Sequence, residues 1–264
     1  MDIEYPDNFE LSNYKDKFLC RYLDIFRLLD IINNHQLYFT RLDKFEDPLE
    51  GFSVNAIRLK LFTSGNPITA ENINKSFSEE EQKQIIEGDK IRREALILEV
   101  SRSQKSQFAN CWFKGEKESI AMWRLYSRKE GVIIKLDASE LIDLVLKAVK
   151  QIRELEDTKM TFGDVDYKNI WPFDFTEVFN NRFNAMKKDR SYSHENEFRF
   201  IIAVPGEMID KFDNIIIKLP SIETLNFEIL ASPFMEKWEL NNLTKMLAKY
   251  GLGEKLRQSN IAIR

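Results

Sequence analysis

The chain is poor in the residues that most often bind zinc or form disulfide frameworks. Its 264 residues include two cysteines, Cys20 and Cys111, and two histidines, His35 and His194. The cysteines lie far apart in apolar runs, so neither a paired-cysteine framework nor a Cys/His zinc site is expected. A nucleophilic pair of Cys111 and His194 is an alternative, although a cysteine in an apolar strand is poorly ionised and unreactive.

An excess of basic residues and a long apolar run are also absent. The formal net charge is -4 and the pI is about 5.5, so nucleic acid is a possible partner that the net charge does not indicate. No apolar stretch approaches the roughly 18 residues of a membrane span, and the chain begins with acidic residues rather than a basic and apolar signal. We therefore expect a cytoplasmic protein without a membrane contact.

Internal repeats and glycine-rich phosphate loops are missing too, which leaves the order of helices and strands as the guide to the fold. Strands and helices mix without a regular alternation, and this pattern predicts an α+β fold with mixed or antiparallel central sheets and flanking helices. We expect one domain over residues 1–264, with a helical insertion at 64–103. Its charged helix has two candidate capping boxes, Ser76 with Glu79 and Ser78 with Glu81.

Hydrophobic spacing predicts the elements of this domain, and residues 1–10 are expected to be a loosely held arm. The predicted strands are 18–22, 37–40, 108–113, 132–136, 165–167, 198–204, 215–219, 227–230 and 259–263. The predicted helices are 23–33, 118–127, 137–149, 175–188 and 235–250.

The main candidate for chemistry is the polar segment that leads into strand 198–204. In an extended segment Glu195, Glu197 and Arg199 share one side. Two adjacent carboxylates disfavour ionising together, so one pKa should rise unless a cation such as Arg199 compensates. Such a pair suits a site in which one group polarises or deprotonates a hydroxyl or amine while the other stabilises positive charge. The alternative is an exposed strand face with an ordinary ion pair.

Three further segments carry polar or aromatic residues. The run Lys187-Lys188-Asp189-Arg190 either holds an anion such as a pyrophosphate or is a solvated helix end. Arg21, in the first apolar strand, either pairs with Asp47 or Glu50 or binds a ligand phosphate. The third is a predicted helix that presents Ser119, Met122, Trp123 and Tyr126 on one face, either as part of a site or, for Met122 and Trp123, as a core stripe.

The order of these motifs resembles the bacterial family catalogued as domain of unknown function 2971. The resemblance spans most of the chain, leaves the insertion outside it, and carries no activity. It rests on Arg21-Tyr22, Leu37-Tyr38-Phe39, Glu46-Asp47-Pro48-Leu49-Glu50, Cys111-Trp112, the helix from Glu118 to Tyr126, Glu130-Gly131-Val132 and the segment from His194 to Arg199.

The same order also resembles the ADP-ribosyltransferases, and this second resemblance implies a function. Those enzymes hold NAD with an arginine on the first core strand, and a glutamate, often within Glu-x-Glu, leads into a later strand. The resemblance implies that Arg21 holds NAD, that Glu197 binds the ribose hydroxyl and stabilises the oxocarbenium-like charge, and that Glu195 orients or deprotonates the acceptor. The middle strand departs from the pattern, because Asn110-Cys111-Trp112 replaces a serine-threonine-serine signature.

The predicted site therefore has a catalytic set and a set that binds NAD, and it requires the strands of Arg21 and Glu197 to form one shared pocket. The predicted activity is transfer of ADP-ribose to a protein or nucleic-acid target, in a toxin or in phage defence. The catalytic set is His194, Glu195 and Glu197. The set predicted to bind NAD is Arg21, Tyr22, Trp112, Ser119, Trp123, Tyr126, Arg190 and Arg199.

Two other functions fit the same residues. A metal-dependent nuclease would use Asp47, Glu50, Glu195 and Glu197 as oxygen ligands for magnesium. A non-catalytic binding module would line a pocket with Trp112, Trp123 and Trp171.

Overall fold

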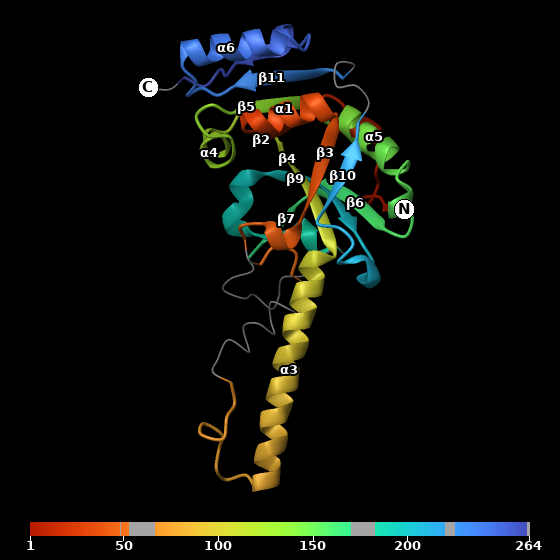
Figure 1. The fold of residues 1–264 in the computed structure, drawn as a ribbon, viewed down its shortest axis with the longest axis vertical. Coiled ribbons are helices and arrows are strands. Elements are labelled where there is room, and N and C mark those ends of the chain that lie inside the picture. The colour runs from red at the N-terminus through yellow and green to blue at the C-terminus, as the bar shows by residue number, and fades with distance from the viewer. Residues whose placement is uncertain (48, 53–66, 170–182, 220–224, 263–264) are drawn as a thin grey trace.

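The computed structural model describes residues 1–47, 49–52, 67–169, 183–219 and 225–262 (Figure 1). Within these residues a ten-stranded mixed sheet carries flanking helices, which confirms the predicted α+β class. The strands are β1 Asp2–Glu4, β2 Phe18–Leu23, β3 Gln36–Arg41, β4 Gln107–Lys114, β5 Val132–Asp137, β6 Lys159–Asp164, β7 Asp166–Lys168, β8 Lys187–Asp189, β9 Glu197–Ala203, β10 Asn214–Lys218, β11 Phe227–Ala231 and β12 Leu256–Gln258. The helices are α1 Ile25–Asn34, α3 Glu79–Lys105, α4 Ile120–Met122, α5 Ala138–Val149 and α6 Lys237–Ala248.

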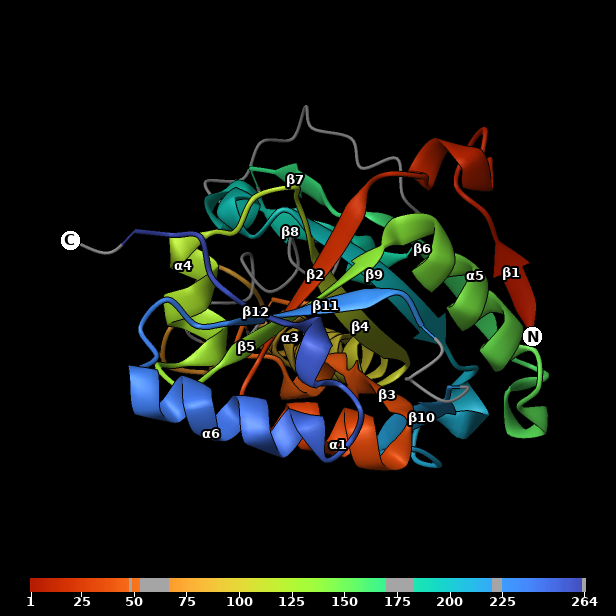
Figure 2. The same ribbon diagram turned by 90° about the horizontal axis from the view of Figure 1, so that it is seen from above.

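The large sheet runs in the order β1-β6-β9-β4-β2-β5-β11-β12, and β3 joins it by pairing with both β4 and β10 (Figure 2). The outer pairs β1–β6 and β11–β12 are parallel, whereas the pairs between them are antiparallel. Strand β9 lies in the interior of the sheet between β4 and β6. Although β9 begins with alternating apolar and charged residues, it is buried on both faces because it lies between two other strands in the interior of the sheet.

One face of the sheet is covered by α1, α5 and α6, which form the main apolar core with it. In α5 the buried residues Leu141, Val145 and Val149 recur every four positions, so one side of the helix faces the sheet. Asp137 begins this helix as predicted, because its side chain accepts hydrogen bonds from the backbone N–H groups of Ser139 and Glu140. None of the helices in the described residues is long and apolar enough to cross a membrane.

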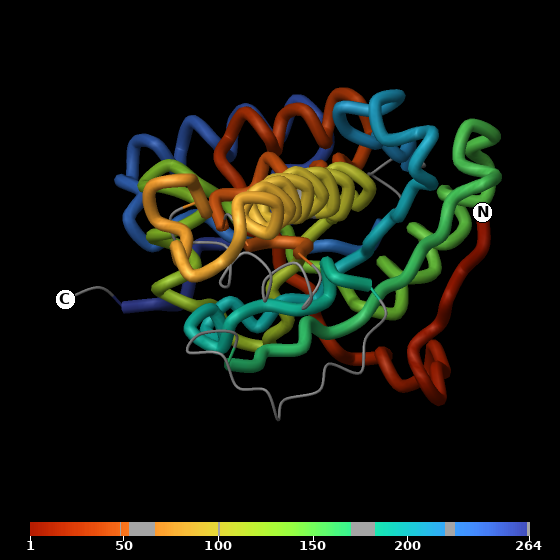
Figure 3. Tube along the Cα trace, turned by 90° about the horizontal axis from the view of Figure 1, so that it is seen from below, coloured from red at the N-terminus to blue at the C-terminus, as the bar shows by residue number. Residues whose placement is uncertain are grey.

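Helix α3 projects from the sheet as a long arm (Figures 1 and 3). Ser78 begins it with a capping box, since the Glu81 N–H bonds Ser78 Oγ at 3.3 Å and the Ser78 N–H bonds Glu81 Oε2 at 2.8 Å. Within the segment 64–103 that was predicted as a helical insertion, α3 begins at Glu79, and Ser78 rather than Ser76 is the capping residue.

Replacing Ser78 with alanine is expected to remove this cap. The first turn of α3 loses about 1 kcal/mol of local stability, because the Glu81 N–H is left without its acceptor. Hydrogen exchange at the first turn measures the loss. Ser76→Ala is the matched control, and equal effects of the two substitutions would contradict the assignment.

Three expectations about the chain are wrong. Residues 1–10 are not a loose arm, because β1 pairs with β6 and the rings of Tyr5 and Phe9 pack edge-on against Phe162. The helix expected at 175–188 is replaced at 184–189 by a 3₁₀ turn and strand β8, while 175–182 lie outside the described residues. In the part of the chain that the structure describes, the last strand is β12 at 256–258 and not 259–262, because its pairing with β11 ends at Gln258; residue 263 of the predicted strand lies outside that part.

Candidate functional site

A buried cluster of charged side chains lies on the face of the sheet opposite α1, α5 and α6. Glu197 and Arg199 come from β9, Lys188 from β8, and Glu195 from the 3₁₀ turn that precedes β9. Glu50 comes from the turn after β3, more than a hundred residues earlier in the chain. All five side chains are at most 8% exposed. Buried charges require partners at close range, and here each carboxylate contacts a cation.

Arg199 is the centre of the cluster, with no exposed side-chain surface. Its Nη1 donates to Glu50 Oε1 at 2.5 Å and to the Ala185 carbonyl at 2.6 Å. Its Nε and Nη2 donate to Glu197 Oε2 and Oε1 at 2.6 and 3.0 Å. The guanidinium group thus makes a bidentate ion pair with Glu197 and holds Glu50 on its other side.

Lys188 lies between the three carboxylates of the cluster. Its Nζ donates to Glu195 Oε2 and, at 2.8 Å, to Glu197 Oε1, and it lies 3.8 Å from Glu50 Oε2. The other oxygen of Glu195, Oε1, accepts a hydrogen bond of 2.5 Å from the Tyr126 hydroxyl. Tyr126 is 45% exposed. Glu195 is therefore the carboxyl group of the cluster that is joined to a partly exposed side chain.

The pKa values of the two neighbouring carboxyl groups are driven apart. Burial raises the pKa of Glu195 to about 7, and a hydrogen bond with Glu197 adds to the rise. The pKa of Glu197 lies well below its usual range, because Arg199 and Lys188 outweigh the opposing effect of burial. The sequence predicted that one carboxyl pKa rises unless a cation such as Arg199 compensates. Arg199 pairs with Glu197, and the pKa of Glu195 rises all the same. When Glu195 is protonated, the negative charges of Glu50 and Glu197 balance the positive charges of Lys188 and Arg199.

Strained backbone flanks Tyr126. The turn Trp123–Ser127 is π-helical, a rare form that often occurs at functional sites. Arg128 follows with φ 60° and ψ −175°, a conformation that costs a residue with a side chain about 1 to 3 kcal/mol. Gly131 permits the turn to close, because a Cβ atom there would lie 2.0 Å from the Ser127 carbonyl oxygen. The backbone conformation of the turn that carries Tyr126 is therefore energetically unfavourable.

The backbone also bends sharply between the two glutamates. Asn196 is left-handed at φ 39° and ψ 55°, and its side-chain amide donates to the Lys114 carbonyl. The Tyr167 hydroxyl accepts a hydrogen bond of 2.9 Å from the Glu197 N–H. These contacts turn Glu195 and Glu197 toward the same cation, Lys188.

Tyr22, Ser119 and Trp123 lie on the same face of the sheet as the charged cluster. The Ser119 N–H donates to the Tyr22 hydroxyl at 2.8 Å, and the Tyr22 and Trp123 rings meet edge-on at 5.3 Å. Trp123 is fully buried and donates to Glu118, which confirms the core-stripe interpretation for Met122 and Trp123. These residues position the turn that carries Tyr126.

The structure does not bring Arg21 to this cluster. In the register of β2, β4 and β9, Cys20 pairs with Phe113 and Phe113 with Glu197, so these three share a face. Arg21, the next residue along β2, lies on the other face, 5.7 Å from the Trp112 ring. Burial lowers its pKa to about 10. An ion pair of Arg21 with Glu50, one of the alternatives that the sequence leaves open, is not formed, because Glu50 binds Arg199 instead.

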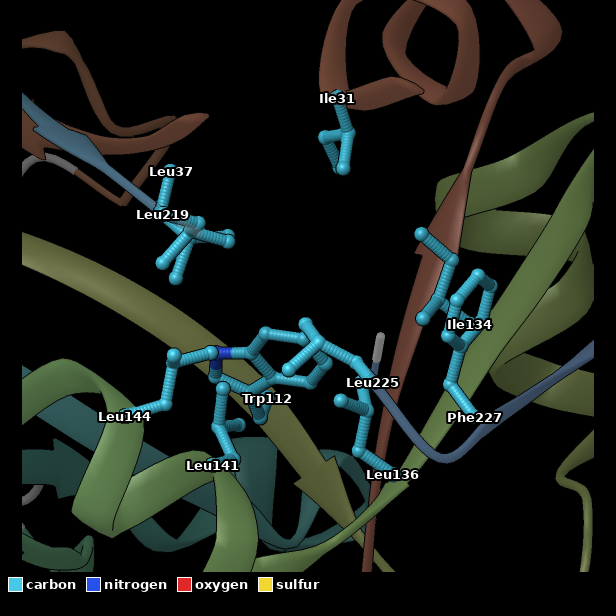
Figure 4. A pocket seen from close by; sticks show the side chains of 10 residues that line it. All are labelled: Ile31, Leu37, Trp112, Ile134, Leu136, Leu141, Leu144, Leu219, Leu225 and Phe227. Atoms are coloured by element: carbon cyan, nitrogen blue, oxygen red, sulfur yellow. The ribbon is translucent and has the colours of Figure 1, made fainter. Parts of the chain in front are cut away.

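The residues predicted to bind NAD therefore do not fit the dinucleotide as one set. Trp112 lines an apolar cavity of about 20 Å³ among leucine, isoleucine and phenylalanine side chains (Figure 4), and its Nε1 donates to Asn110. Such a cavity is about the size of one water molecule, whereas ligand pockets measure roughly 300 to 1,000 Å³. The guanidinium group of Arg199 is occupied by Glu50 and Glu197.

His194 and Arg190 lie outside the buried cluster, on the 3₁₀ turn Arg190–Glu195. Both are exposed, and His194 Nδ1 lies 3.2 Å from the Ser191 carbonyl oxygen. Over the residues that the structure describes, no group of three or more His, Cys, Asp or Glu side chains is arranged to hold a metal ion. The glutamates expected to be magnesium ligands contact Lys188 or Arg199 instead.

Sequence reasoning missed the roles of Lys188 and Glu50. The sequence predicts either an anion-binding run or a solvated helix end at Lys188, and a partner of Arg21 or a metal ligand at Glu50. The alternation of strand β8 places Lys188 on the buried side, with Lys187 and Asp189 half-buried on the other. Predicting a strand instead of a helix at 187–189 would have placed Lys188 on the side opposite Lys187 and Asp189.

The Glu195 pKa predicts how stability varies with pH. A carboxyl whose folded pKa is raised from 4.5 to about 7 favours the folded state below pH 4.5, and this contribution is lost as the pH rises through 7. Between pH 5 and 8 the wild-type chain should lose on the order of 1 to 2 kcal/mol relative to Glu195→Gln. Urea unfolding at both pH values measures the difference, and parallel curves for the two proteins would contradict it.

Comparison with known proteins supports the assignment made from the motifs. A family model described as protein of unknown function (DUF2971) matches residues 122–200, which include Tyr126, Lys188, Glu195, Glu197 and Arg199. The comparisons with curated proteins and with solved structures each found no match. The family description names no activity, so the function is argued from the site.

Proposed function

We propose that the chain is an enzyme that transfers a group to a hydroxyl or amine, with Glu195 as its general acid and base. The observation that carries this proposal is the hydrogen bond between Glu195, a buried carboxyl group, and the partly exposed Tyr126. A general base works best when its pKa lies near the working pH, and the pKa of Glu195 is about 7.

The contacts support a two-step path for the proton. The acceptor hydroxyl or amine gives its proton to the Tyr126 oxygen while the Tyr126 proton moves to Glu195 Oε1. The reverse transfers then return a proton to the leaving group. Glu197 stays ionised between Arg199 and Lys188, and Lys188 holds the second oxygen of Glu195 in place. Such proton transfer contributes typically 10²- to 10⁴-fold to a rate.

Transfer of ADP-ribose from NAD is the particular reaction that the motif order predicts, and it stays a prediction, as does a role in a toxin or in phage defence. The other two functions have less support. The glutamates of the metal-dependent nuclease are neutralised by the chain's own cations. Trp112 and Trp123 are buried in separate cores rather than lining one pocket, and Trp171 lies outside the described residues.

The test is turnover by the purified protein with and without Glu195. Labelled NAD with a cell lysate, labelled RNA and labelled DNA are incubated separately, each in the presence of a metal chelator. We expect one labelled product, formed faster as the pH rises through 7 and lost in Glu195→Gln. A product that survives Glu195→Gln, or that requires an added divalent metal, would contradict the proposal.

A further inference from the structure

The arm formed by α3 is connected to the charged cluster at its root. The root is the pair of segments 50–51 and 103–107, where the chain leaves the sheet for the arm and returns to it. Ser103 Oγ donates to the Gly51 carbonyl at 2.5 Å, and Gln104 Nε2 donates to the Glu50 carbonyl at 3.0 Å. The backbone of Glu50 is thus fixed by the last turns of α3.

A second set of hydrogen bonds leads from the same helix end to Arg199. Asn184 Nδ2 donates to Ser103 Oγ at 3.2 Å, and the Ala185 N–H donates to Gln107 Oε1 at 3.0 Å. The Ala185 carbonyl in turn accepts from Arg199 Nη1. The root therefore holds both partners of the buried Glu50–Arg199 ion pair.

We propose that Glu50 is a positioning residue that keeps Glu195 protonated, and that the root of the arm fixes Glu50 for this purpose. The reason is the charge balance among the five buried groups. Glu50 and Glu197 together neutralise Lys188 and Arg199, which leaves no uncompensated cation for an ionised Glu195. Without the Glu50 charge, the same two cations are balanced only when Glu195 is ionised. The inference rests on the proposed role of Glu195 as general acid and base.

The experiment follows the titration of Glu195 directly, by carbon-13 NMR of protein labelled at the glutamate carboxyl carbon. The Glu195 signal is assigned by its loss in Glu195→Gln. Glu50→Gln keeps the shape of the side chain and an oxygen that accepts from Arg199. We expect its Glu195 midpoint to fall below about 6, at least a tenfold increase in the acid dissociation constant.

Two further variants make the result decisive. Glu46→Gln removes an exposed charge from the same turn, and we expect less than a twofold change in the dissociation constant because water screens it. Ser103→Ala removes a link to Gly51 without touching any charge, and we expect a smaller fall in the same direction. If Glu50→Gln does not fold, the Glu195 midpoint in Ser103→Ala tests the inference in its place.

The outcomes separate this inference from the proposed function. A wild-type midpoint near 7 that stays unchanged in Glu50→Gln and in Ser103→Ala would overturn the role of Glu50 and leave the role of Glu195 intact. A wild-type midpoint near 4.5 would instead remove the proposed function. A shift of equal size in Glu46→Gln would also overturn the inference, because it would show a general charge effect.

Discussion

Replacing Arg199 with methionine is expected to lower the free energy of unfolding by about 3 to 5 kcal/mol. The substitution keeps an apolar stem but removes both guanidinium ion pairs and the hydrogen bond to the Ala185 carbonyl, so Glu50 and Glu197 are left buried with Lys188 as their shared cation. Removing one partner of a buried ion pair costs more than the pair contributes, because the remaining charge stays out of water. Urea unfolding at pH 7 measures the loss.

The control for this substitution is Arg27→Met in α1. Arg27 pairs with Asp24 at 3.6 Å, but its side chain is 72% exposed, so the change should be within about 0.5 kcal/mol. Arg199→Lys should fall between the two, because lysine restores the charge without the forked geometry. A loss below about 1 kcal/mol in Arg199→Met would contradict the description of Arg199 as the centre of the cluster.

Glu195→Gln is expected to reduce turnover by about 10²- to 10⁴-fold while the protein stays folded. Glutamine has nearly the same shape and still accepts a hydrogen bond from Tyr126, but it neither gains nor loses a proton near pH 7. The remaining four charged groups stay balanced, since glutamine is neutral like the protonated Glu195. The rate of product formation across pH 5 to 9 measures the effect.

Tyr126→Phe distinguishes proton transfer from a purely structural role of Glu195. The variant keeps the ring and loses the hydroxyl that connects Glu195 to the surface. If the proton passes through Tyr126, this variant also loses most of its turnover, and the circular dichroism spectrum is unchanged. Full activity of Tyr126→Phe would show that Glu195 acts without this path.

Local alternation was sufficient to predict part of the site. Glu197 and Arg199 lie on one side of β9 and form an ion pair, as alternation predicts. Glu195 precedes the strand, and the left-handed backbone of Asn196, which alternation does not predict, turns it toward Lys188. Such predictions depend on neighbours in the sequence, for which the strand period is informative.

The rest depended on strand register, which alternation does not give. Arg21 and Glu197 lie on strands that are separated only by β4, yet a shift of one residue decides which face each side chain takes. Glu50 binds Arg199, which lies 149 positions later in the chain, whereas the sequence suggested Arg21 or a metal ion as its partner. Long-range pairing of this kind is set by the folded sheet and not by the local pattern.

The most direct test of the account is the titration midpoint of Glu195 in the wild-type protein, read from its carboxyl carbon-13 signal. A carboxyl group buried beside Glu197 and bonded to Tyr126 should titrate near pH 7. A midpoint near 4.5, the ordinary value for a glutamate in water, would contradict the buried, charge-balanced cluster and the acid–base role built on it.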